Sequence, residues 1–491
     1  MATAFVSVDS ADLLLSANGA KTGTTLLWGD RVRTSASSGA WTKVKARGRE
    51  GWVRTAQLGG KSLLELYFID VGQGDGVLIR TPDHRHVMVD GGFNRSRQPS
   101  GKNAADFVDW KFVKDYGQDT VALDAMIASH NDADHYGGLW DLLSDDDSAA
   151  AELDAGDVTV EAFYHAGLSW WKSGASRTLG PSENTDQGPM WTRLLTDRAS
   201  AAAASGPGGG NKLAGEWAKF IDCVLMTKKA SGQPTPFRRL SHEDQYLPGF
   251  GPEAGKASIR VLGPVTYEVG GKPALRKFSG GDSINTNGQS TLLRVDYGRT
   301  RILLTGDLNT ASQLALLKDY AGNIQELECD VAKACHHGSD DVSYKFLQAL
   351  RPAVTVISSG DNEGHDHPRP GIVAASATSG YLTIENDRMV SPLIYSTELA
   401  RSHRFSKAEL LKVARDPEPA LELKNAALKR ASVRVTKASG RANTLTMDSA
   451  LILSDLIYGL VNVRTDGERI LCATMNEEKR TWQIKVLKSR F

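Results

Sequence analysis

The sequence is poor in cysteine and carries no excess of either charge. Four cysteines occur among 491 residues and none has CxxC spacing, so neither a disulfide scaffold nor a thiolate zinc site is expected. Lysine plus arginine number 58, as do aspartate plus glutamate. Balanced charge gives no whole-molecule attraction to nucleic acid or to an anionic membrane, although a local basic groove is still allowed.

Long apolar runs are missing as well. No stretch approaches the roughly eighteen apolar residues of a transmembrane helix, and residues 1–20 lack the basic and apolar regions of a secretion signal. The sequence therefore favours a cytoplasmic protein without a membrane partner. Its hydrophobic content of 41% suits a globular protein, and its length suits two or three domains.

The first sixty residues have the pattern of short strands. Three segments alternate apolar and polar residues between serine and glycine clusters, namely 29–34, 41–46 and 50–58. Residues 1–60 resemble a bacterial Src-homology-3-like domain, which implies a small β-barrel. Trp41 and Trp52 either pack its core or line a groove for a ligand.

Strand patterns alternate with helix patterns from residue 61 to residue 400, which predicts an α/β fold class. An irregular insertion at 144–256 interrupts this alternation. Residues 401–491 form a third part: 401–441 carry eleven Lys/Arg against four Asp/Glu, and β-hairpin patterns follow. These C-terminal strands either extend the preceding domain or mediate self-association.

The strongest chemical signal is SHNDADHYGG, residues 129–138, which follows an apolar strand and opens a helix. Imidazole and carboxylate groups are suitable ligands for zinc, manganese or iron. Four such groups within six residues are hard to explain as one helix cap. The four candidate metal ligands are His130, Asp132, Asp134 and His135.

Further groups of the same kind stand at strand ends. Asp90 ends VMVDGG, Asp307 ends LLTGD, and the pair His336-His337 ends AKACHHGS. Strand ends that gather at one edge of a sheet form a ligand pocket, so these groups point to a single site. His165, after another strand, is either a further ligand or a packing residue.

The order of these motifs resembles the metallo-β-lactamase superfamily, and more narrowly the hydrolase domain of ComEC-type competence proteins. The segments that carry the resemblance are YFIDVGQGDGVLI, VMVDGG, SHNDADHYGG, NTNGQSTLLRV, ILLTGD, VAKACHHGS and VTVISSGDNEGHDHP. They span residues 63–375 apart from the insertion. The resemblance implies a four-layer αββα sandwich, with the N-terminal barrel and the C-terminal strands as additions, and two divalent metal ions, zinc or manganese.

The resemblance also implies a role for each matched ligand. His130 and Asp132 help to hold one metal, while Asp134 and His135 hold the other. Asp307 bridges the two.

Further residues are placed around these ligands by the same resemblance. His337 is a ligand and His336 contacts the substrate. Asp90 orients ligands from just outside them. Asp70 and Asp75, from the DVGQGD segment, are expected in the same neighbourhood.

The sequence departs from the family pattern at two places. Asn287 and Ser290 stand in NTNGQS, where a ligand histidine usually precedes the GD strand. The closing Asn-Gly-His-Pro pattern reads Asn362, Gly364, His365 and His367-Pro368 with altered spacing. His367 is the better match, and it is either a ligand or a substrate contact.

These roles imply a hydrolase in which two metal ions activate a water for in-line displacement, without a protein nucleophile. The catalytic set is Asp134, His336 and His367; either histidine would stabilise the developing oxyanion or protonate the leaving group. The substrate implied is a phosphodiester, with DNA favoured. The basic stretches 226–240 and 401–441 would then follow its phosphates.

Two alternatives stay open. One is a hydrolase of a small phosphodiester or another ester, whose pocket is walled by tryptophans of the insertion. They are Trp170, Trp171, Trp191 and Trp217. The other is a recruited subunit whose residues 1–60 bind a protein or cell-wall partner.

Overall fold

The fold is known from a computed structural model. It describes residues 2–97, 103–144, 157–206, 212–359, 365–397, 404–407, 410–413, 418–424, 431–436, 442–447, 451–454, 460–476 and 481–491. Asn362 and Gly364 lie outside these ranges. No helix within them combines the length and hydropathy needed to cross a bilayer.

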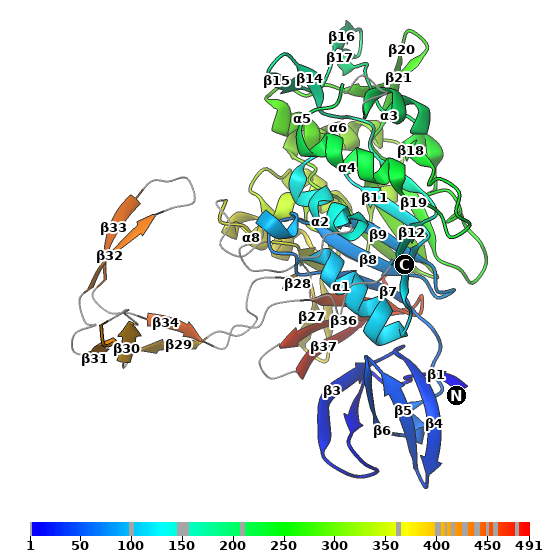
Figure 1. The fold of residues 1–491 in the computed structure, drawn as a ribbon, viewed down its shortest axis with the longest axis vertical. Coiled ribbons are helices and arrows are strands. Elements are labelled where there is room, and N and C mark those ends of the chain that lie inside the picture. The colour runs from blue at the N-terminus through cyan, green and yellow to red at the C-terminus, as the bar shows by residue number, and fades with distance from the viewer. Residues whose placement is uncertain are drawn as a thin grey trace.

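The N-terminal residues form an antiparallel six-stranded sheet in the order β1-β4-β5-β6-β2-β3 (Figure 1). Its strands are β1 (Ala2–Phe5), β2 (Ser10–Leu14), β3 (Lys21–Leu27), β4 (Arg31–Ser38), β5 (Trp41–Ala46) and β6 (Arg49–Arg54). The core consists of aliphatic side chains such as Leu13, Val44 and Val53. Trp41 and Trp52 are half-buried and outside it, so they do not pack the core.

A nine-stranded sheet follows, in the order β18-β13-β11-β9-β8-β7-β35-β36-β37. Its strands are β7 (Leu64–Phe68), β8 (Gly76–Arg80), β9 (His86–Gly91), β11 (Ala125–Ala128), β13 (Phe163–His165), β18 (Phe237–Arg239), β35 (Val461–Thr465), β36 (Arg469–Asn476) and β37 (Thr481–Lys488). Strand β35 pairs antiparallel with β7, with Val463 opposite Leu66. The C-terminal strands therefore extend this domain.

A six-stranded sheet lies against the first, in the order β19-β22-β23-β24-β25-β28. Its strands are β19 (Ser258–Gly263), β22 (Leu292–Tyr297), β23 (Thr300–Leu304), β24 (Val331–Lys333), β25 (Val354–Ile357) and β28 (Leu393–Ser396). A shared apolar core joins Leu66 and Ile127 of the first sheet to Val295 and Val331 of the second. The main core thus lies between the sheets.

Helices cover the outer face of each sheet. On the first sheet these are α1 (Ala104–Trp110), α2 (Ala133–Leu143) and α4 (Gly215–Met226), whose apolar sides pack on outward residues such as Leu78 and Met126. On the second, α6 (Thr310–Asp319) and α7 (Tyr344–Leu350) pack on Leu303. The predicted α/β class is confirmed.

The insertion is more regular than its sequence indicates. Its strands β13 and β18 extend the first sheet in parallel from β11, and its helix α4 covers that sheet's outer face. Its other elements are β12 (Asp157–Val160), β14 (Trp171–Ser173), β15 (Ser176–Thr178), β16 (Ser182–Thr185), β17 (Gly188–Trp191) and α3 (Arg198–Ala204). The expectation of an irregular segment is wrong for these residues.

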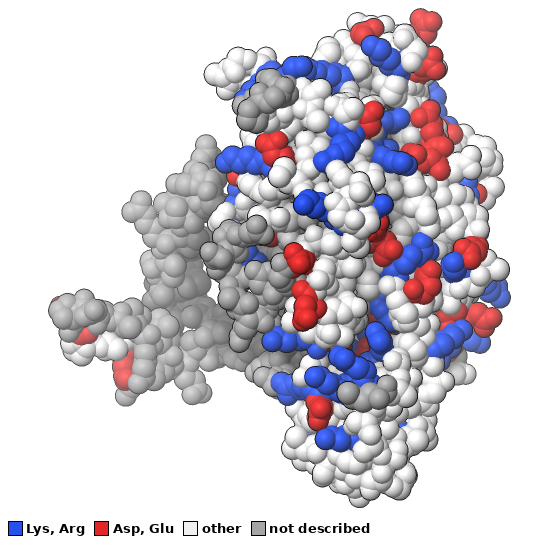
Figure 2. Space-filling model, turned by 45° about the vertical axis from the view of Figure 1, so that its right-hand side comes forward, with Lys and Arg blue, Asp and Glu red and all other residues white. Residues whose placement is uncertain are grey.

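Residues 404–454 form three antiparallel strand pairs in the parts described. These are β29 (Arg404–Lys407) with β34 (Leu451–Ser454), β30 (Leu410–Val413) with β31 (Leu421–Lys424), and β32 (Ala431–Thr436) with β33 (Ala442–Met447). Elsewhere on the surface, Lys/Arg and Asp/Glu are interspersed over the face in Figure 2, in agreement with a net charge of zero.

The N-terminal sheet docks on the C-terminal strands. Leu27 and Trp28 share a small core with Leu471 of β36. Beside it, the fully buried Arg464 of β35 places Nη1 2.7 Å from Asp30 Oδ1 and donates to the carbonyl oxygen of Trp28 at 2.7 Å. The first and last parts of the chain are therefore joined through a buried ion pair.

Candidate metal centre

Four chain segments bring the candidate ligands together. His130 follows β11, and Asp134 and His135 lie in the first turn of α2. Asp307 follows β23, and His337 lies in a short 3-10 segment, Cys335–Gly338, after β24. His336 and His337 both have positive φ, 47° and 52°. The backbone therefore changes direction sharply at these two residues, and so do their side chains.

Close backbone contacts at two glycines allow these segments to approach one another. A Cβ on Gly138 of α2 would lie 2.0 Å from the carbonyl oxygen of Gly91 in β9. A Cβ on Gly74 would lie 2.0 Å from the carbonyl oxygen of Asp134. Only glycine permits these approaches, so helix α2 and the DVGQGD loop can meet at the site.

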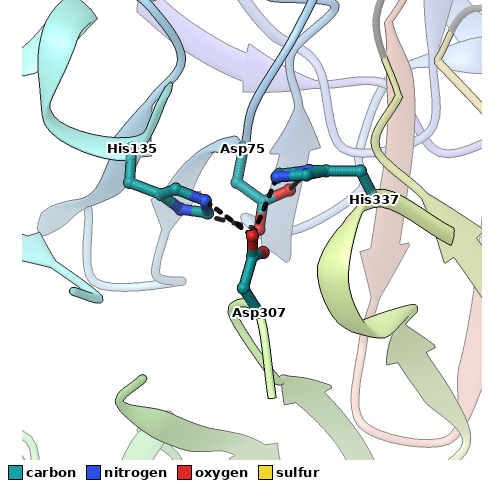
Figure 3. A group of neighbouring side chains, drawn as sticks. All are labelled: Asp75, His135, Asp307 and His337. Carbon is teal, nitrogen blue, oxygen red and sulfur yellow. Dashed lines mark ion pairs between the residues drawn. The ribbon is translucent and has the colours of Figure 1, made fainter. Parts of the chain in front are cut away.

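The centre of the cluster is the Asp307 carboxylate (Figure 3). Its Oδ2 atom lies 3.2 Å from His135 Nε2 and 3.0 Å from His337 Nε2. Neither Nε2 atom has a partner in hydrogen-bonding geometry. Asp134 adds a carboxylate oxygen 3.5 Å from His337 Nε2. Two imidazoles and two carboxylates thus face one another.

The opposite ring nitrogens are held from behind. His135 Nδ1 lies 2.9 Å from Asp90 Oδ2, and His337 Nδ1 lies 3.2 Å from Asp75 Oδ1. A carboxylate on Nδ1 fixes ring orientation and directs Nε2 toward a metal. Asp90 and Asp75 therefore each hold a histidine ring through its Nδ1 atom, on the side away from the Nε2 atom that faces Asp307.

His130 and Asp132 form the neighbouring part of the cluster. His130 Nε2 is buried without a hydrogen-bond partner and lies 3.8 Å from Asp132 Oδ2. His130 Nδ1 lies 3.1 Å from Ser129 Oγ and 3.2 Å from Ser290 Oγ. Burial lowers the pKa of His130 to about 3, which leaves the neutral imidazole that metals bind. Asp132 accepts a hydrogen bond of 2.8 Å from Thr286 Oγ1.

The cluster is rich in carboxylates, and these act on its histidines: against burial, which lowers it, Asp307 raises the pKa of His135 and of His337 well above the usual value. Five carboxylates meet one buried lysine, Lys333; they are Asp75, Asp90, Asp132, Asp134 and Asp307. Burial and then Asp134 raise the pKa of Asp132 to about 7. The donor types, the gathering of carboxylates around three imidazoles and the Nε2 atoms without a hydrogen-bond partner all fit divalent metal ions.

Lys333 is a site residue that the sequence reasoning missed. Its ammonium forms an ion pair with Asp75, lies 3.6 Å from Asp307 Oδ1 and donates to the carbonyl oxygen of Gly306 at 2.9 Å. A lysine inside the otherwise apolar strand VAKAC was the available signal, because lysine is almost never fully buried unless it is paired.

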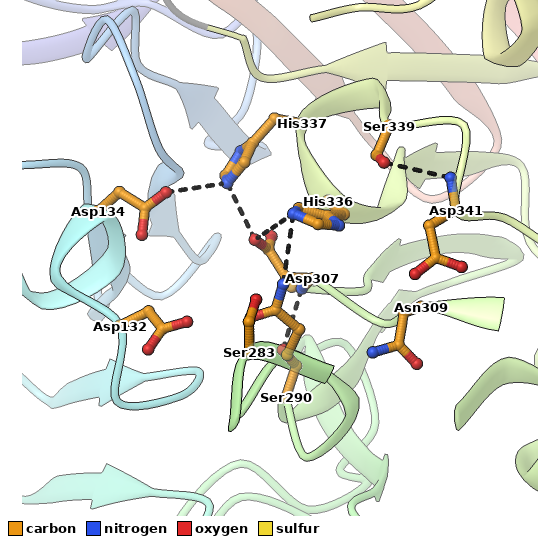
Figure 4. Close-up of polar contacts among 12 residues, drawn as sticks. Asp132, Asp134, Ser283, Ser290, Asp307, Asn309, His336, His337, Ser339 and Asp341 are labelled. Carbon is orange, nitrogen blue, oxygen red and sulfur yellow. Dashed lines mark hydrogen bonds and ion pairs between the residues drawn. The ribbon is translucent and has the colours of Figure 1, made fainter. Parts of the chain in front are cut away.

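A cavity of about 990 Å³ opens on this cluster. His336 lines it and is 26% exposed, while His337 is 1% exposed. Figure 4 shows both histidines beside Asp307. His336 Nε2 lies 4.0 Å from Asp307 Oδ2 and 3.3 Å from the amide of Asn287. His367 also lines the cavity, with its ring 5.7 Å from that of His336. The roles predicted for these histidines stay predictions.

Two predicted residues lie elsewhere. The ring of His165 packs 4.8 Å from Phe237 and 6.1 Å from Trp217, and burial lowers its pKa to about 3; its contacts are those of a packing residue. Asp70 lines a different cavity, of about 700 Å³, beside α1 and the N-terminal sheet. Its neighbour in the motif, Asp75, is the one that reaches the cluster.

The insertion contributes to the cavity wall less than expected. Of its four tryptophans only Trp170 lines the cavity, while Trp171, Trp191 and Trp217 are buried in the packing of the insertion. None of residues 226–240 lines the cavity.

Comparison with curated proteins finds two competence proteins. The chain is 33% identical over 117 residues to competence protein ComA of Neisseria gonorrhoeae, covering 24% of this chain and 16% of that protein. It is 29% identical over 93 residues to ComE operon protein 3 of Bacillus subtilis, covering 19% of this chain and 12% of that protein. The resemblance to competence proteins is thus confirmed, and the chain spans less than a fifth of these relatives' length.

Comparisons with family models and solved structures add little. No family model matches the chain. A metal-dependent hydrolase of the β-lactamase superfamily aligns with a TM-score of 0.31 at 13% identity, over 68% of this chain and 95% of that one. A proposed metal-dependent hydrolase from Parabacteroides distasonis aligns with a TM-score of 0.30 at 9% identity, over 73% and 100%. Such TM-scores do not by themselves establish a shared fold.

Proposed function

We propose that this chain is a metal-dependent hydrolase that cleaves phosphodiesters. The observation that carries the proposal is the convergence of buried imidazole Nε2 atoms on the Asp307 carboxylate without hydrogen bonds between them. Two imidazoles that share one carboxylate oxygen, each with a second carboxylate on its Nδ1 atom, form the arrangement that metal-binding histidines take.

The ligand set divides into two neighbouring groups. His130 and Asp132 would hold one ion, and His135, with Asp134 and His337, would hold a second. Asp307 lies between the groups. When bound, two divalent ions supply a water of lowered pKa and neutralise charge on a phosphate.

The chain's own residues would orient the ligands and the substrate. Asp90 and Asp75 fix the His135 and His337 rings through Nδ1. His336 lines the cavity and lies within hydrogen-bonding distance of Asn287. It is placed to donate a hydrogen bond to a phosphate oxygen or a proton to a leaving group.

A phosphodiester is favoured over a neutral ester by the cavity's cations. Arg97, Arg177 and Arg369 line it together with histidines, and a guanidinium matches phosphate geometry. Similarity to two competence proteins supports a nucleic acid, with DNA first. A small phosphodiester is the alternative, because Trp170 of the insertion lines the same cavity.

The test is hydrolysis of labelled single- and double-stranded DNA and of bis-p-nitrophenyl phosphate, with manganese or zinc, by the full chain. His135→Ala is expected to abolish hydrolysis and to lower the bound metal measured by elemental analysis. His84→Ala, at an exposed position outside the cavity, is the control and should retain both. Wild-type protein that binds no metal and cleaves none of these substrates would refute the proposal.

A second role is partner binding through the N-terminal sheet. Trp41 and Trp52 are half-buried and lie on one face, since Trp41 is opposite Arg54 and Trp52 is opposite Lys43 across strands β5 and β6. Arg54 stacks over Trp41 at 4.9 Å. Loss of a captured partner from the full-length Trp41→Ala, Trp52→Ala variant, with hydrolysis retained, is the expected result. Retained capture would count against this role.

A further inference from the structure

One arginine on the insertion side of the cavity has no anionic partner within the described chain. Arg177, in the middle of β15, is exposed, and its guanidinium makes no ion pair or hydrogen bond there. The other two arginines of the cavity are engaged: Arg97 pairs with Glu216 at 2.8 Å, and Arg369 lies 3.9 Å from Asp366. Arg177 is therefore the guanidinium most available to an anionic ligand.

The position of Arg177 is nevertheless fixed. Its Cζ atom lies 3.8 Å from the ring centroid of Trp170, which is only 3% exposed. Trp170 Nε1 in turn donates a hydrogen bond of 2.9 Å to the carbonyl oxygen of Asn131, between His130 and Asp132. A cation over an indole face is held in place electrostatically. The guanidinium is thus positioned relative to the metal-binding loop itself.

We propose that Arg177 binds a phosphate adjacent to the scissile one. The substrate would then be a phosphodiester that carries at least one further phosphate, such as an oligonucleotide, and not a single isolated diester. The proposal rests on the proposed function, since it places the second phosphate in the same cavity as the metal cluster.

Charge and geometry both support a single, defined contact. Lys/Arg and Asp/Glu are interspersed over the face in Figure 2 and are equal in number over the sequence, so selection of a polyanion depends on individual groups near the site. A guanidinium offers two parallel N–H donors to phosphate. Because Trp170 already orders this side chain, less conformational entropy is lost on binding.

The insertion also offers a matched control. Arg193 stacks on Trp171 with its Cζ 3.6 Å from the ring centroid, but neither residue lines the cavity. Arg193→Gln therefore removes the same charge and the same kind of stacking as Arg177→Gln without touching the cavity.

Binding of a fluorescein-labelled oligonucleotide to the full-length protein is measured by anisotropy at several salt concentrations. For Arg177→Gln we expect Kd to rise about tenfold. The slope of log Kd against log salt should fall by about 0.7–0.9, the value of one phosphate contact. Arg193→Gln should stay within about twofold of wild type, and Arg177→Lys should keep the wild-type salt slope. Unchanged binding by Arg177→Gln would overturn the proposal.

Hydrolysis gives a second, separable readout. Arg177→Gln should raise KM for the oligonucleotide and lower kcat/KM for the oligonucleotide more than for bis-p-nitrophenyl phosphate, because the simple diester has no second phosphate. An equal loss on both substrates would overturn the proposal by placing Arg177 at the scissile group. Wild-type protein that cleaves neither substrate would refute the proposed function, while the anisotropy result would still decide whether Arg177 binds phosphate.

Discussion

The ammonium group of Lys333 lies 3.6 Å from Oδ1 of Asp307, inside the cluster proposed to hold metal ions. The side chain of Lys333 is 2% exposed, and its ammonium also pairs with Asp75. A buried ammonium is costly unless it is paired, and so is a buried carboxylate. Lys333 therefore allows Asp75 and Asp307 to stay ionised next to each other.

Replacing Lys333 by methionine should destabilise the chelator-treated protein. The substitution removes the ammonium from Asp75 and Asp307 and leaves them only the imidazoles of His135 and His337. Breaking a buried ion pair in this way costs about 3–5 kcal/mol. Urea unfolding in the presence of a chelator measures the loss. Lys345→Met, at an exposed position on α7, should change the free energy of unfolding by less than about 0.5 kcal/mol. Equal stability of the two variants would show that Lys333 does not compensate these carboxylates.

The local part of the site could be predicted from the sequence. His130, Asp132, Asp134 and His135 fall within six residues at a strand-to-helix junction, where one turn of backbone brings them together. Asp307 could be added because a strand pattern ends just before it. The motif order that resembles competence proteins is likewise a linear feature, and two alignments bear it out.

The rest depends on contacts between distant segments. Asp70 and Asp75 stand in one short motif, and only the path of the loop sends Asp75 to His337 and Asp70 to another cavity. The ammonium of Lys333 is paired by Asp75, a residue far away in the sequence. The strands of the insertion, such as Phe163–His165 and Asp157–Val160, have only three or four residues, too few for a periodic pattern.

Gly138→Ala should destabilise the fold and disturb the ligands on α2. Its Cβ would lie 2.0 Å from the carbonyl oxygen of Gly91, so the helix would have to move away from β9, at a cost of about 1–3 kcal/mol. Urea unfolding tests this. The same substitution at Gly322, where no atom lies within 4 Å of the added Cβ, should be almost neutral. A neutral Gly138→Ala would mean that α2 is not held against β9 at this point.

Arg464→Met should loosen the N-terminal sheet from the C-terminal strands. It removes the guanidinium 2.7 Å from Asp30, which is 5% exposed, and leaves Asp30 paired with Arg47 alone at 2.8 Å. The expected cost is about 1.5–3 kcal/mol in the free energy of unfolding, that of a lost hydrogen bond to a charged group, together with faster proteolysis between the two parts. Arg388→Met on an exposed hairpin is the control. Unchanged proteolysis and stability would show that the apolar contact of Trp28 and Leu471 suffices for docking.

The stability of the protein should fall on mild acidification partly because of His86. Its ring is buried 4.8 Å from that of Phe112, and burial, aided by Arg80, lowers its pKa to about 3. The folded state therefore stays unprotonated at this site, while the unfolded state binds a proton below about pH 6.5. The contribution of His86 to stability is thus fully present above pH 6.5 and declines as pH falls toward 3.

Between pH 7 and pH 5.5 the wild-type protein should lose about 1.3 kcal/mol more free energy of unfolding than His86→Gln, as measured by urea unfolding at each pH. Comparing the two pH slopes removes the constant effect of the substitution on packing. Parallel slopes would show that His86 is protonated in the folded state as readily as in the unfolded one, contrary to its burial.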